Sequence, residues 1–146
     1  MQIKKEIKIL CNAQIIYENL ATFDFLNKIN SSTGVNSTLI FENERVQKYS
    51  LNIAGVGEWE SEKILIPETR MIIIHRVKPL LPFKYMVIIY RIEEKKKEGY
   101  CLLHYTEEFE LEQEYKYLEK RITKNITEKD EDILIKIAES LNSYDW

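Results

Sequence analysis

The chain is poor in the residues that mark fibrous, disordered or disulfide-bonded proteins. Its 146 residues include 4 Gly, 3 Pro and 2 Cys, whereas 45% are hydrophobic and 31% are charged. This balance is ordinary for a globular protein, and the length predicts a single domain over residues 1–146. A chain of this size buries about 68–70% of its unfolded surface, which is enough for a core with one internal cavity.

Long apolar runs and a large excess of one charge are also absent from the sequence. No segment approaches the roughly 18 apolar residues of a membrane span, and residues 1–6 lack the apolar core of a signal peptide. We therefore expect a cytoplasmic protein with no membrane span. The net charge of −3 provides no basic face, so we expect no nucleic-acid partner.

Cysteine and histidine are too few and too dispersed to predict a metal centre. Cys11 and Cys101 fit no metal-ligand spacing and are most simply reduced thiols, with a disulfide between two strand ends as the alternative. His75 and His104 belong to no nucleophile motif and are expected on the surface of a sheet. The sequence also lacks a Gly-rich phosphate loop, and we expect no metal and no cofactor.

The hydrophobic periodicity predicts an α+β fold. Residues 3–10 alternate as a first strand, Asn12 stands at the N-cap of a helix over Ala13–Ala21, and residues 23–29 form a second short helix. Short turns then join six strands in an antiparallel meander, predicted at residues 36–41, 46–53, 57–64, 70–77, 83–93 and 100–111.

The C-terminal part changes from the period of a strand to that of a helix. Its apolar stripe consists of Ile133, Leu134, Ile137, Ala138 and Leu141. Thr127 and Asp130 form a variant of the capping box and predict a helix start at that point. Residues 112–125 are also compatible with a helix, so the final helix is either long or broken.

Residues 57–110 carry the most information about function. Alternation places Trp59, Ser61 and Lys63 on one face of a strand, because strand side chains have a period of two. An indole, a hydroxyl and a cation on the concave side of a sheet would line a pocket and not merely fill a core.

This stretch resembles the polyketide aromatase/cyclase branch of the START-like (SRPBCC), helix-grip superfamily. The family pattern is roughly Glu-Trp-x-Ser-x-Arg, x-x-Arg-Val, Pro-Phe-x-Tyr-Met and an acidic residue before Phe. The chain has the same pieces in the same order: Glu58-Trp59-Glu60-Ser61-Glu62-Lys63, Arg76-Val77, Pro82-Phe83-Lys84-Tyr85-Met86 and Glu108-Phe109. With the first strand and the helices added, the resemblance covers nearly the whole chain.

The resemblance implies a fold and a function. The fold is a curved antiparallel seven-stranded sheet wrapped around a long C-terminal helix, with two short helices between strands 1 and 2 and a cavity inside. The function is the binding of a hydrophobic, partly oxygenated molecule, with intramolecular aldol cyclisation and dehydration of a poly-keto chain. The alternative is a non-catalytic carrier or sensor of a lipid or aromatic ligand, because the superfamily includes such proteins.

Three residues are the catalytic candidates. Lys63 stands where the family carries its cavity Arg, and it is either a cavity cation or a surface lysine with its ammonium in water. Glu107 either pairs with Lys63 inside the cavity or lies on its rim. Tyr90 replaces a family Trp and is either an amphipathic cavity wall or a core tyrosine.

The other site residues are expected to contact the ligand. Leu26 replaces the family's Trp in the second helix, and Thr33 lies in the loop at the pocket mouth. Arg76 resembles the family's second internal Arg, with an exposed ion pair as its alternative. The remaining wall residues follow from inward parity: Trp59, Ser61, Ile72, Ile74, Met86, Ile88, Tyr105 and Phe109.

The opposite face of the predicted sheet is also apolar in part. Met71, Ile73, Val87 and Ile89 have outward parity, whereas a one-sided antiparallel sheet normally alternates apolar with polar residues. An exposed apolar patch usually marks a contact surface, so the sequence predicts self-association as a homodimer.

Overall fold

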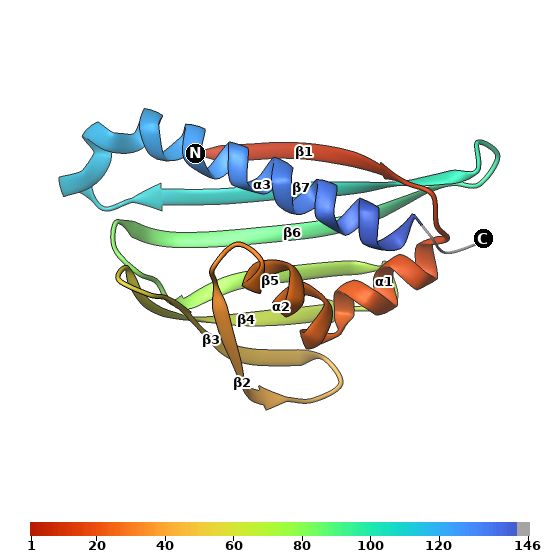
Figure 1. Ribbon diagram of the computed structural model, residues 1–146, viewed down its shortest axis with the longest axis horizontal. Helices are drawn as coiled ribbons and strands as arrows, with labels where there is room; N and C mark the ends of the chain where they lie inside the picture. The colour runs from red at the N-terminus through yellow and green to blue at the C-terminus, as the bar shows by residue number, and fades with distance from the viewer. Residues whose placement is uncertain (143–146) are drawn as a thin grey trace.

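The computed structural model describes residues 1–142, and its main element is a seven-stranded antiparallel sheet (Figure 1). The strand order is β1-β7-β6-β5-β4-β3-β2, so the first strand pairs with the last. The strands are β1 (Gln2–Ile9), β2 (Asn36–Glu42), β3 (Val46–Ile53), β4 (Gly57–Ile66), β5 (Met71–Lys78), β6 (Phe83–Lys95) and β7 (Tyr100–Leu111). The predicted meander is confirmed, with strand ends that differ by one or two residues.

Two short helices connect β1 to β2, and a single residue separates them. The side chain of Asn12 accepts a hydrogen bond from the Ile15 N–H at the start of α1 (Ala13–Ala21). Thr22 ends α1 and caps α2 (Phe23–Ser31), where its hydroxyl accepts from the Phe25 N–H. Side-chain caps of this kind satisfy amide groups that have no partner within the helix.

The chain ends in a long helix. A 3-10 turn, η1 (Gln113–Leu118), leads directly into α3 (Glu119–Leu141). The predicted start at Thr127 is wrong: this residue lies inside α3, and its hydroxyl donates to the carbonyl of Thr123. All three helices lie on the same face of the sheet (Figure 1). A curved sheet around a long C-terminal helix, with two short helices after β1, is the helix-grip fold.

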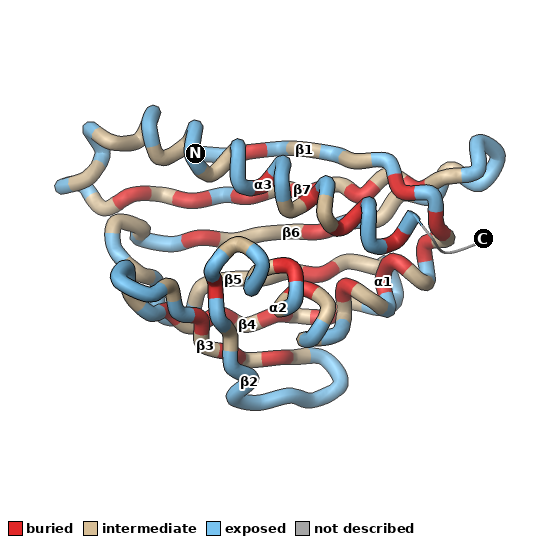
Figure 2. Tube along the Cα trace, viewed as in Figure 1, coloured by how far each residue is buried: buried red, intermediate tan, exposed pale blue. Residues whose placement is uncertain are grey.

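Burial follows the predicted alternation on the face that carries the helices. Along β4 the buried residues are Trp59, Ser61, Lys63 and Leu65, and the residues between them are half-buried. The main core packs α1 and α3 against β5, β6 and β7, and both cysteines lie in it as buried free thiols. By contrast, β2 is an edge strand and is mostly exposed (Figure 2).

The outer face of the sheet carries the apolar residues expected there. Met71, Ile73, Val87 and Ile89 are half-buried, and Ile73 lies opposite Ile89. Self-association through this face stays a prediction. We expect sedimentation to show a dimer that Ile73→Lys weakens, since burying a lysine there costs desolvation energy. A monomer over a wide concentration range would contradict it.

Candidate functional site

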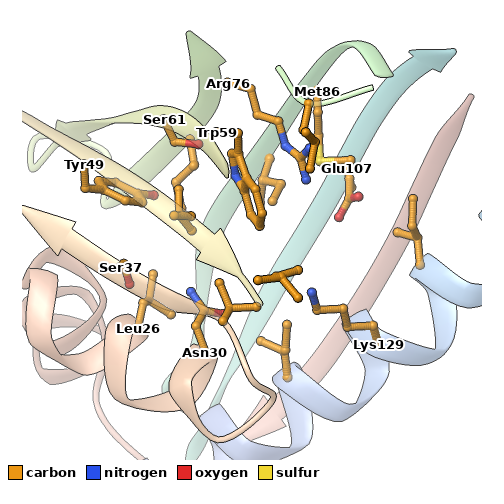
Figure 3. Close-up of a pocket in the computed structure, with 18 of the residues that line it drawn as sticks. Leu26, Asn30, Ser37, Tyr49, Trp59, Ser61, Arg76, Met86, Glu107 and Lys129 are labelled. Carbon is orange, nitrogen blue, oxygen red and sulfur yellow. The ribbon is translucent and has the colours of Figure 1, made fainter. Parts of the chain in front are cut away.

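A cavity of about 330 Å³ lies between the concave face of the sheet and the helices α2 and α3 (Figure 3). Most of its lining is apolar, and strands β3 to β7 contribute most of the wall. The principal apolar lining residues are Leu26, Val35, Leu51, Trp59, Ile74, Met86, Ile88, Ile126 and Ile133. Such a volume lies at the lower end of the usual range for small-molecule sites, about 300–1,000 Å³.

The loop between β5 and β6 contributes part of the wall because of a glycine. Leu80 packs against the cluster of Val35, Tyr49, Leu51 and Trp59, and it lies directly over Gly57. Gly57 has a φ of +148°, and a Cβ added there would lie 2.8 Å from Leu80 Cδ1. A side chain at position 57 would therefore be strained and would displace the side chain of Leu80.

Lys63 lines the cavity, but its ammonium already has a protein partner. Its Nζ donates to the carbonyl of Thr22 at 2.8 Å, while its cross-strand neighbour Gln47 donates to the carbonyl of Ala21 at 2.7 Å. Both side chains are buried. Desolvation lowers the pKa of Lys63 to about 7. The two residues thus fasten β3 and β4 to the junction between α1 and α2.

The pair considered for Lys63 and Glu107 does not form. Lys63 lies opposite Ile74, Ile74 opposite Ile88, and Ile88 opposite Glu107. Two strands therefore separate the cation from the carboxylate, and each has other partners. The surface position considered for Lys63 and the rim position considered for Glu107 are also wrong, because both side chains are buried.

Arg76 is a second cation that faces the cavity. Its Cζ lies 4.7 Å from the ring centroid of Trp59 and 4.9 Å from that of Phe83, so two aromatic rings hold the guanidinium. The group points toward Glu107 (Figure 3). Desolvation lowers the pKa of Arg76 to about 10, and the charge of Glu107 opposes this shift. Within residues 1–142 the guanidinium has no hydrogen-bond or ion-pair partner, so the expected exposed ion pair is absent and its donors remain available.

A tyrosine hydroxyl links two acidic side chains at the same end of the cavity. Tyr105 Oη contacts Glu107 Oε1, and it lies 3.0 Å from Asp130 Oδ1 on α3. All three residues are buried. Burial and the nearby Glu107 carboxylate raise the pKa of Asp130 to about 8. Lys129 extends from α3 toward this end (Figure 3), where desolvation and the charge of Arg76 lower its pKa.

Sequence reasoning missed Asp130 as a site residue. The capping-box interpretation places Asp130 near the start of a helix. A signal was nevertheless present, since Asp130 precedes Leu134 by four residues and Ile137 by seven, on the buried stripe of α3. A carboxylate on the buried stripe of a helix is a strong indication of a partner or of a proton.

Tyr90 is part of the wall of the cavity. Its ring packs edge-to-face on Tyr105 with centroids 5.2 Å apart, and burial raises the pKa of its hydroxyl. Within residues 1–142 this hydroxyl has no hydrogen-bond partner. Tyr90 can therefore contact a ligand, but Tyr105 is the tyrosine that joins the acidic groups.

The other expected ligand contacts divide into two groups. Leu26, Ser61, Ile74, Met86, Ile88 and Tyr105 are among the residues that line the cavity. Thr33 is not, because its hydroxyl turns back to the carbonyl of Asn30 at 2.7 Å. Ile72 and Phe109 have the expected parity but are packed in the core. Asn30 and Ser37 add polar groups that parity did not predict (Figure 3).

Neither a metal cluster nor a membrane helix is found in the described part of the chain. Within residues 1–142, no three His, Cys, Asp or Glu side chains are arranged to hold a metal ion. No helix in this range is both long and apolar enough to cross a bilayer.

Comparison with solved structures finds the same fold in enzymes. The Zhui aromatase/cyclase of a Streptomyces species matches with a TM-score of 0.72 and 16% identity, over 94% of this chain and 93% of that one. Norcoclaurine synthase from Thalictrum flavum, in complex with dopamine and hydroxybenzaldehyde, matches with a TM-score of 0.69 and 16% identity, over 95% and 87%. A protein from Thermus thermophilus matches with a TM-score of 0.79 and 14% identity, over 97% of both chains.

Comparisons by sequence find no relative. No model of a known protein family matches the chain, and no curated protein matches it. At these identities the likeness between structures establishes the helix-grip fold and does not by itself establish a function.

Proposed function

We propose that the protein binds a compact, hydrophobic, partly oxygenated small molecule in this cavity. The observation that carries the proposal is the pairing of an apolar wall with a guanidinium that has no hydrogen-bond or ion-pair partner within residues 1–142 and points toward a buried carboxylate. A few polar groups in an apolar pocket orient a ligand, while the apolar wall supplies most of the affinity. The small volume favours a ligand of one or two rings over a long chain.

We further propose that the site performs acid–base chemistry on a carbonyl group, as in aldol closure and dehydration. Arg76 would stabilise negative charge on an enolate oxygen, an effect of about 2.7–4 kcal/mol for a well-placed donor. Glu107 would exchange protons with the ligand. The resemblance to aromatase/cyclases supports this reaction, and the dopamine and hydroxybenzaldehyde of the norcoclaurine synthase complex are likewise compact oxygenated aromatics.

A non-catalytic carrier is the second candidate, and Lys63 favours it. This residue stands in place of the family's cavity Arg, yet it donates to the carbonyl of Thr22. If catalysis depends on a cation at that position, the protein would bind its ligand without turnover. Native mass spectrometry of the freshly purified protein would identify a co-purifying ligand by its mass, and turnover of a poly-keto probe would separate enzyme from carrier.

Ile88→Trp tests binding in the cavity. Ile88 lies on the central strand of the lining, between Ile74 and Glu107. An indole there would fill ligand space, so we expect the affinity for a hydrophobic fluorescent probe to fall by about tenfold or more. Ile89→Trp, on the outer face, is the matched control. Equal affinity in the two variants would show that the probe binds elsewhere.

A further inference from the structure

The two contacts of the Tyr105 hydroxyl need more than the single proton that a phenol carries. The hydroxyl lies within hydrogen-bond distance of Glu107 Oε1 and Asp130 Oδ1, yet a phenol carries one proton and can donate once. If both carboxyl groups were ionised, the phenol could donate to only one of them. The other carboxylate oxygen would then face the phenol oxygen in a buried site without a hydrogen bond. Both contacts are satisfied if one carboxyl is protonated and donates to the phenol oxygen.

The surroundings place this proton on Asp130. Its Oδ2 is buried and has no hydrogen-bond partner within residues 1–142, an arrangement that a carboxylate would make costly. Glu107 points into the cavity toward the guanidinium of Arg76 (Figure 3). The order that satisfies both contacts of the phenol is an Asp130 carboxyl that donates to Tyr105, and a Tyr105 hydroxyl that donates to the Glu107 carboxylate. The Asp130 carboxyl also lies within hydrogen-bond reach of Glu107, so Tyr105→Phe tests whether the phenol is needed.

We propose that Asp130, Tyr105 and Glu107 form a proton relay that interconverts the keto and enol forms of a carbonyl compound in the cavity. This inference rests on the proposed binding function and defines its ligand more narrowly. The ligand is an enolisable ketone or aldehyde, because the relay needs a carbonyl oxygen that accepts a proton and a neighbouring C–H that gives one up. A plain hydrocarbon offers no such pair of sites, and an ionised carboxylate resists enolisation because its negative charge disfavours loss of the neighbouring proton.

The proton balance closes without another reactant. Asp130 passes its proton to Tyr105 while Tyr105 passes its own to Glu107, and Glu107 delivers a proton to the ligand's carbonyl oxygen. The Glu107 carboxylate then takes the proton from the adjacent carbon, as the C–H electron pair becomes the enol double bond. The reverse shift through Tyr105 returns that proton to Asp130. Glu107 is the catalytic residue, whereas Tyr105 and Asp130 are positioning residues that act through it.

The experiment measures hydrogen exchange of a simple ketone. β-Tetralone is incubated with the protein in D₂O, and proton NMR follows deuterium entering the carbons beside the carbonyl. Binding of β-tetralone is measured separately by titration of each variant. Tyr105→Phe keeps the ring and both carboxyl groups but breaks the relay, so exchange of the bound ketone should slow by about a hundredfold while affinity changes less than about twofold.

Matched variants separate the relay from a general loss of structure. Asp130→Asn and Glu107→Gln should lose exchange to a similar degree. Tyr17→Phe removes a hydroxyl from a buried core tyrosine outside the cavity, and Asp132→Asn removes a carboxylate from the exposed side of α3. Both controls should exchange as the unmodified protein does.

Each outcome decides one of the two proposals. Binding with exchange that depends on Tyr105 and Asp130 supports the relay. Binding with no exchange, or exchange unchanged in Tyr105→Phe and Asp130→Asn, overturns the relay and leaves the binding function standing. Absence of β-tetralone binding overturns the proposed function, and the relay with it. If Tyr105→Phe does not fold, Asp130→Asn with its Asp132→Asn control decides the question.

Discussion

Arg76→Met is expected to weaken binding of a carbonyl ligand and to spare a hydrocarbon of the same shape. The comparison uses β-tetralone and tetralin, which differ only in that a carbonyl group of β-tetralone replaces a CH₂ group of tetralin. Methionine has no donor but fills much of the space between the rings of Trp59 and Phe83. A hydrogen bond to a charged donor contributes about 1.5–3 kcal/mol, so β-tetralone affinity should fall by roughly 10- to 100-fold.

Calorimetric titration of both ligands checks this result. Arg91→Met, which removes an exposed arginine from β6, is the control and should bind both as the unmodified protein does. Tetralin affinity should stay nearly constant in both variants. Equal losses for the two ligands in Arg76→Met would mean that the guanidinium maintains the cavity wall and does not bind the oxygen.

The second large effect is a pH dependence of the free energy of unfolding that comes from Lys63. Its pKa is about 7 in the folded protein and near 10.5 when the chain is unfolded. Between these values the unfolded state binds more protons, so this residue makes the free energy of unfolding rise with pH from about 7 to about 10.5. One pKa unit corresponds to about 1.4 kcal/mol, which makes the full effect on the order of a few kcal/mol.

Lys63→Met should remove this rise. Urea unfolding from pH 6.5 to 10 would measure the difference between the protein and the variant, and the difference should grow in favour of the protein as pH increases. Asp130 has the opposite sign, because its raised pKa adds stability below about pH 4 that is lost as pH approaches 8. Asp130 contributes equally to the free energy of unfolding of the protein and of Lys63→Met, so the difference between the two cancels that contribution. The exposed Lys97→Met is the control, and an identical slope in the two variants would mean that Lys63 titrates as a solvated lysine.

Period-two alternation was sufficient to find the faces of the strands. It placed Trp59, Ser61 and Lys63 on one side because side chains on a strand alternate whatever the tertiary context. The same rule placed Ile74 and Ile88 inside, and the helical stripe of α3 located its buried face. These features are local, and a single sequence contains them.

The positions of the polar atoms could not be predicted in the same way. Lys63 meets a carbonyl 41 residues away in the chain, and Tyr105 meets a carboxyl on α3, 25 residues away. Such contacts depend on how the helices cross the sheet, which periodicity does not specify. As a result, the sequence offered Lys63 as the cavity cation, whereas in the described part of the chain it is Arg76 whose donors have no hydrogen-bond partner.

The central claim is that a compact oxygenated ligand occupies the cavity, and NMR of isoleucine methyl groups tests it most directly. Ile74 and Ile88 line the cavity, while Ile73 and Ile89 are their neighbours on the outer face of the same strands. Titration with β-tetralone should shift the methyl signals of Ile74 and Ile88 in a saturable manner and leave those of Ile73 and Ile89 in place. Shifts confined to Ile73 and Ile89, or no saturable shift at Ile74 and Ile88, would contradict the claim.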